Sequence, residues 1–172
     1  MAKQKITPVD EHAISFLGVA EQYQKAGNLL YESDRTLRTP MYFMYMHAIE
    51  LALKASLRAA GLPIAADRKR KHHQITELYE ESRALGLRIG PDDAFDLRNV
   101  VALLEGANED QGLRYFTLKS QSIPELSWLR DTVEKLLRAV EPGVMKKAEA
   151  DGIVAGRAVK LDMTFSKPTL KG

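Results

Sequence analysis

The residues best suited to chemistry are His47, Glu50 and Lys54, which lie in the stretch HAIELALKASLRAAG at residues 47–61. Offsets of three and seven place all three on one face of a helix. Glu50 and Lys54 are four residues apart with the acid first, the order that favours an ion pair on a helix surface. Two interpretations stay open: such a surface pair, or a partly buried polar cluster that lines a ligand-binding groove.

The densest charge run in the chain is RKRKHH at residues 68–73. A run of this kind is either a solvated loop or a surface that contacts phosphate groups. No aromatic residue is interleaved with it, so base stacking is not indicated. Adjacent histidines point about 100° apart on a helix and no third ligand is in view, so we expect no metal site. The nucleic-acid-binding candidates are Arg68, Lys69, Arg70, Lys71 and His73.

Arg114 and Tyr115 complete the set of ligand-binding candidates. In the simpler interpretation Tyr115 and Phe116 cover one end of the fold, while Arg114 pairs with a carboxylate. Alternatively these residues face an anionic ligand or a partner protein, because a guanidinium forms bidentate bonds with phosphate. The sequence has no glycine-rich phosphate loop, no HExxH and no nucleophile elbow. It therefore shows no complete catalytic constellation.

The composition is typical of a soluble globular protein. The chain has 172 residues, 45% of them hydrophobic and 28% charged, which favours one domain and a tail. It contains no cysteine, which excludes disulfides and thiolate metal sites and fits a reducing compartment. Neither a long apolar run nor an N-terminal leader is evident, so we expect a cytoplasmic protein without membrane contact. A net charge of +2 is too small to indicate nucleic acid by itself.

Apolar residues at helical spacing predict five helices. We expect them over residues 8–31, 40–61, 75–85, 91–106 and 122–142. Pro8 suits a first helical turn, Gly61 and Gly86 suit helix ends, and the last helix opens with a capping-box pattern, SIPE. The predicted fold class is all-α, an antiparallel bundle of four to five helices over residues 1–143.

The C-terminal extension, residues 144–172, has a different pattern. Val159, Leu161, Met163 and Phe165 alternate with polar residues, which predicts a short β-strand at 158–165. An isolated strand leaves backbone groups unpaired. We therefore expect the tail either to pack across its own bundle or, as we favour, to exchange with a second subunit in a homodimer.

The second-helix pattern HAIELALKASLRAAG, the following KHHQITELYEESRALG and the later LEGANEDQGLRYF occur in the order found in the HEPN superfamily. These segments span residues 41–116, and the chain resembles that family of small helical bundles from prokaryotic toxin, defence and nucleotidyltransferase-associated proteins. The resemblance implies a homodimer that engages a nucleotidyltransferase-like partner protein or RNA. It implies no cofactor.

Catalytic members of that superfamily are ribonucleases with an Arg followed, after four to six residues, by a His. Arg98 is followed at those positions by Leu, Leu and Glu, and Arg114 by Lys, Ser and Gln. Arg68 and His73 fit the spacing but lie in the basic linker, where an imidazole is poorly held. The resemblance thus favours a non-catalytic binding or regulatory module. The alternatives are a metal-independent ribonuclease of toxin type and a bundle that binds a nucleotide or another small molecule.

Overall fold

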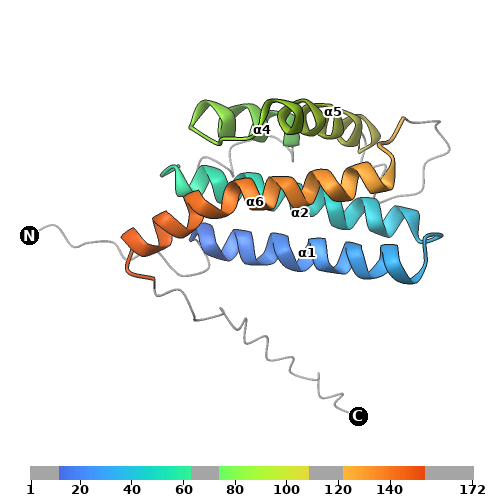
Figure 1. Cartoon of the computed structure of the whole chain (residues 1–172), viewed down its shortest axis with the longest axis horizontal. Helices are drawn as coiled ribbons and strands as arrows, with labels where there is room; N and C mark the ends of the chain where they lie inside the picture. Colours follow the sequence, from blue (N-terminus) through green and yellow to red (C-terminus); the bar gives the residue numbers. More distant parts are fainter. Residues whose placement is uncertain (1–11, 63–73, 109–121, 154–172) are drawn as a thin grey trace, which may run out of the picture.

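The computed structural model describes residues 12–62, 74–108 and 122–153, and five helices account for most of them (Figure 1). No strand occurs within these three ranges. The all-α bundle predicted from the sequence is therefore confirmed. The helices are α1 (Ala13–Ser33), α2 (Arg38–Ala59), α4 (Ile75–Ala84), α5 (Pro91–Ala107) and α6 (Leu126–Ala150).

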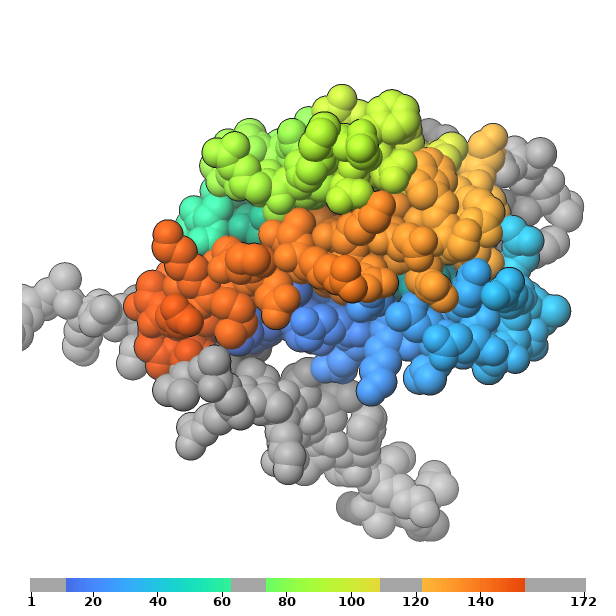
Figure 2. Space-filling model, in the orientation of Figure 1, coloured from blue at the N-terminus to red at the C-terminus, as the bar shows by residue number. Residues whose placement is uncertain are grey.

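Helix α2 is the centre of the bundle and packs against α1, α4 and α6. α1 and α2 form an antiparallel pair, and α4 and α5 form a second hairpin that lies over α2 and α6 (Figure 1). α2 and α6 begin at the same end, where the Tyr42 hydroxyl donates a hydrogen bond of 2.6 Å to the carbonyl of Pro124. In the space-filling view α6 runs between the α4–α5 layer and α1 (Figure 2).

Small residues allow α2 to approach its neighbours closely. Ala48, Ala52 and Ala55 are completely buried, as expected from the alanine-lined face of the sequence. On the α1 side, a Cβ placed on Gly27 would lie 2.8 Å from the ring of Tyr45. Only glycine therefore fits at position 27 with the helices at this separation.

Two glycines end their helices as the sequence predicts. Gly61 and Gly86 have φ angles of +94° and +106°, which L-residues rarely adopt. After each glycine the chain folds back, so that the Leu62 N–H bonds to the Leu57 carbonyl and the Leu87 N–H to the Ser82 carbonyl. These bonds satisfy carbonyls at the helix ends that would otherwise lack partners.

Two helices begin later than the sequence predicts. α1 begins at Ala13, after His12, whose extended backbone has ψ of 152°, and the predicted start at Pro8 lies outside the described residues. In α6, Glu125 is itself the N-cap instead of the third helical residue. Its carboxylate accepts from the Ser127 hydroxyl and from the backbone N–H groups of Ser127 and Trp128, the last two at 2.9 and 3.1 Å. The hydroxyl bond first, and then the backbone bonds, lower the pKa of Glu125.

The predicted end of the last helix at Pro142 is also wrong, because α6 continues to Ala150. The domain boundary expected after residue 143 therefore lies inside this helix. Val144 and Ala148 extend the buried stripe of α6 beyond Pro142, while the proline itself is exposed. Burial of two further turns thus outweighs one missing backbone hydrogen bond. The predicted strand at 158–165 lies outside the described residues.

The continuity of α6 predicts that helix-favouring substitutions at its proline and glycine stabilise the protein. Gly143→Ala should raise the free energy of unfolding by about 0.5–1 kcal/mol, since a Cβ there meets nothing within 4 Å. Pro142→Ala should raise it by up to about 3 kcal/mol. Urea denaturation measures both changes.

Gly61→Ala is the matched control, because its positive φ strains an alanine. This variant should be less stable than the natural protein. A Gly143→Ala protein with unchanged or lower stability would contradict a continuous α6.

Candidate functional site

The structure brings His47, Glu50 and Lys54 together on one face of α2. The Lys54 Nζ lies 2.7 Å from the Glu50 Oε1, and the His47 Nδ1 lies 3.4 Å from the Glu50 Oε2. Helical spacing sets both contacts, since residues three and four apart lie one above the other. Glu50 is therefore held between an ammonium and an imidazole.

Burial excludes one of the two interpretations of this cluster, the surface ion pair. Glu50 is only 2% exposed, whereas the side chains of His47 and Lys54 are each 22% exposed. A surface ion pair would leave the carboxylate in water. The cluster is instead a buried carboxylate whose two neighbours reach the surface. That it lines a ligand-binding groove stays a prediction.

Aromatic rings fix the orientation of His47. The ring of Tyr23 from α1 meets it edge-on, with the centroids 4.5 Å apart, and the ring of Phe43 lies nearly parallel at 5.9 Å. The Nδ1 atom is buried and forms no hydrogen bond. It is close enough to the Glu50 carboxylate for an ion pair, but the geometry is not that of a hydrogen bond. Because Nδ1 is buried, the exposed part of the imidazole is formed by its other ring atoms.

The remaining candidates from the sequence lie outside the described residues. This applies to Arg114 and Tyr115 among the ligand-binding candidates, and to all five nucleic-acid-binding candidates, Arg68, Lys69, Arg70, Lys71 and His73. The structure therefore places only the α2 part of the predicted site.

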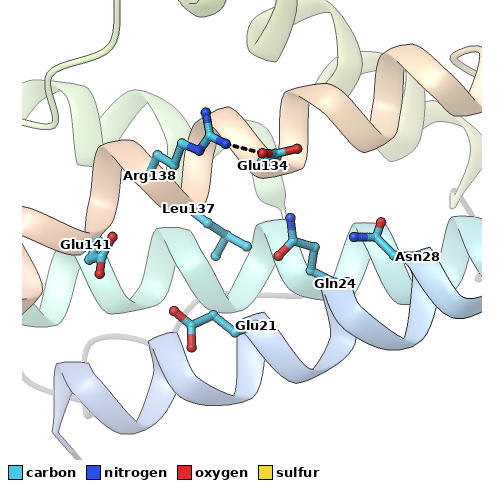
Figure 3. A pocket seen from close by; sticks show the side chains of 7 residues that line it. All are labelled: Glu21, Gln24, Asn28, Glu134, Leu137, Arg138 and Glu141. Carbon is cyan, nitrogen blue, oxygen red and sulfur yellow. Dashed lines mark hydrogen bonds and ion pairs between the residues drawn. The ribbon is translucent and has the colours of Figure 1, made fainter.

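The structure also reveals a polar groove of about 400 Å³ between α1 and α6, which the sequence did not suggest (Figure 3). Each helix supplies a polar stripe at helical spacing, but the pairing of the two stripes depends on how the helices pack. Glu134 and Arg138 form an ion pair at the rim. The groove is lined by Glu21, Gln24, Asn28, Glu134, Leu137, Arg138 and Glu141.

Glu21, one of the three glutamates that line the groove, is harder to ionise than a free glutamate. Partial burial, and secondly the charge of Glu141, raise the pKa of Glu21 above its usual value of 4.5. Deeper in the bundle, the Tyr45 hydroxyl donates a hydrogen bond of 2.9 Å to the Asn28 Oδ1. Burial raises the pKa of Tyr45 to about 12, so its hydroxyl ionises less readily than that of a free tyrosine.

Comparisons with protein-family models, curated proteins and solved structures found no match. Across residues 12–62, 74–108 and 122–153, no group of three or more His, Cys, Asp or Glu side chains is placed to hold a metal ion. None of the described helices has the length and apolar character needed to cross a membrane.

The first prediction from this geometry concerns Lys54. Lys54→Met keeps the apolar stem but leaves the buried carboxylate of Glu50 without its ammonium. The free energy of unfolding should fall by about 2–4 kcal/mol, somewhat less than for a fully buried pair because Lys54 is partly exposed. Urea denaturation at neutral pH measures the loss.

Lys135→Met serves as the matched control. Its ammonium is also 2.7 Å from a carboxylate, that of Asp93, but both side chains are well exposed. A surface pair contributes little, so this loss should be much smaller. Equal losses in the two variants would contradict the importance of burial at Glu50.

The second prediction concerns the pH dependence at Glu21. Because folding raises the pKa of this carboxyl, the folded state is favoured while the group is protonated and loses stability as the pH rises above 4.5. Glu21→Gln should therefore raise the melting temperature at pH 7 and have no effect well below pH 4.5. Glu149→Gln, on the exposed side of α6, is the control. A stabilisation that persists unchanged in acid would contradict the ionisation argument.

Proposed function

We propose that this protein is a non-catalytic binding module of HEPN-like architecture, and that the face of α2 around Glu50 binds phosphate groups of RNA. The observation that carries the proposal is the buried Glu50 carboxylate between His47 and Lys54. Three features support it: the cost of burying this charge, the groups that the cluster offers to a ligand, and the resemblance in sequence.

A buried carboxylate destabilises a helix that serves only for packing, because the charge loses its hydration. Removing a charge from water costs several kcal/mol before its partners compensate, and apolar residues of similar volume often give equal or greater stability. The rest of the buried surface of α2 is almost entirely apolar. A role for Glu50 beyond packing explains why a charge is placed in this helix.

That role is to position Lys54 and His47 for a ligand. Lys54 uses one N–H toward Glu50 and has two further donors on an ammonium that is partly exposed. His47 is fixed between Tyr23 and Phe43, whose rings belong to the type of side chain on which bases stack. Two helical turns, about 10 Å, separate His47 from Lys54, a span suited to a base at one end and a phosphate at the other.

The sequence supplies the remaining support. The basic run at residues 68–73 follows α2 in the chain and would add attraction for an RNA backbone. The resemblance to the HEPN superfamily also implies RNA or a nucleotidyltransferase-like protein as partner. The homodimer and the nucleotidyltransferase-like partner remain predictions from that resemblance.

Fluorescence anisotropy with labelled single-stranded and hairpin RNAs tests the proposal. Lys54→Gln should weaken binding about tenfold, the effect of one charge-assisted phosphate contact. It should also reduce the slope of log K against log salt concentration by about one. Lys54→Arg keeps the charge and should retain most of the affinity. Lys25→Gln, on an exposed position of α1, should bind as the natural protein does.

Three other outcomes would overturn the proposal. Absence of RNA binding would remove the assigned ligand, and a thermal shift with mononucleotides alone would favour the nucleotide-binding bundle. Metal-independent RNA cleavage that disappears in His73→Ala would establish the toxin-type ribonuclease instead.

A further inference from the structure

Helix α5 carries an outward stripe that none of the described helices covers. Its centre is Phe95, which at 69% exposure is the most exposed of the large hydrophobic side chains in the described residues. Asp92 lies three residues before it and Arg98 three residues after it, and both are exposed. Buried residues occupy the other side of α5, at Leu97, Val100, Val101 and Leu104.

The charges of this stripe are complementary to those of the same stripe on a second copy of the chain. The acid and the base lie at equal distances on either side of the aromatic ring, so two copies of α5 can pair in antiparallel orientation about a twofold axis at Phe95. Asp92 of each copy then faces Arg98 of the other, and the two rings meet at the centre. Parallel pairing would place like charges against each other, so the charges also select the orientation.

Arg98 is available for this contact. Its guanidinium lies 3.3 Å from the Glu80 Oε1, but the two side chains are 64% and 52% exposed. Such a surface pair contributes little to stability. Arg98 can therefore bind an aspartate of a second copy, instead of or in addition to Glu80, with little loss of free energy.

We propose that α5 forms a self-association surface, in which a second copy of this chain packs antiparallel on Asp92, Phe95 and Arg98. One helix face on each side is a small interface, so the dimer is weak and depends on concentration. The inference does not rest on the proposed RNA site, because α2 and its cluster are not part of the contact.

Sedimentation velocity on the full-length protein, from low micromolar to near-millimolar concentration, tests the proposal. The natural chain should pass from monomer to dimer over this range. In a dimer of Asp92→Arg, the new arginine of each copy would face Arg98 of the other. In a dimer of Arg98→Asp, the new aspartate of each copy would face Asp92 of the other. Because like charges then meet, each single variant should remain monomeric. Circular dichroism verifies that both variants keep their helices.

The decisive sample is an equimolar mixture of the two single variants. In the mixed dimer the arginine introduced at position 92 of one chain would face the aspartate introduced at position 98 of the other. The unchanged Arg98 of the first chain would face the unchanged Asp92 of the second, so both contacts become favourable. The mixture should therefore dimerise although neither variant does so alone. The double variant that carries both changes should also dimerise.

Leu29→Glu is the matched control for Phe95→Glu, because both replace an exposed hydrophobic residue on an outer helix face. Phe95→Glu should abolish the dimer and Leu29→Glu should leave it intact. The proposal is overturned if the natural chain stays monomeric, if the single variants still dimerise, or if the mixture remains monomeric.

Discussion

The buried carboxylate of Glu50 is the constraint on which this account depends. It lies in the helix that contacts α1, α4 and α6, so its surroundings cannot be changed without disturbing most of the bundle. The charge must be compensated where it is, and α2 itself supplies Lys54 four residues later and His47 three residues earlier. Tyr23 of α1 then fixes the imidazole from outside the helix. Stability and the proposed binding site are thus built from the same side chains.

The packing of α2 explains features elsewhere in the chain. Close contact with α1 requires a residue without a side chain at position 27, since the ring of Tyr45 fills that space. Tyr42 ties the start of α2 to the segment before α6. The buried face of α6 continues past Pro142, so contact with the bundle maintains the helix where the local sequence would end it.

The sequence predicted those features that depend on local spacing. His47, Glu50 and Lys54 share a face because the helix has 3.6 residues per turn, and Gly61 and Gly86 end helices because of their backbone freedom. The burial of Glu50 could not be predicted, since it depends on what covers α2. The groove between α1 and α6 likewise requires the pairing of helices that are distant in the sequence. Local rules predicted both ends of α6 wrongly. Packing against the bundle extends the helix past Pro142, and the carboxylate of Glu125 is itself the N-cap.

The most direct test of the central claim is a titration with RNA followed by the ring signals of the histidines in an NMR spectrum. The chain has only four histidines, so replacement of each by glutamine assigns every signal. If RNA binds at the α2 cluster, the His47 ring signal should shift in proportion to the bound fraction, while that of His12 should not. RNA binding that shifts His72 and His73 but leaves His47 unchanged would contradict the account and assign binding to the basic run alone.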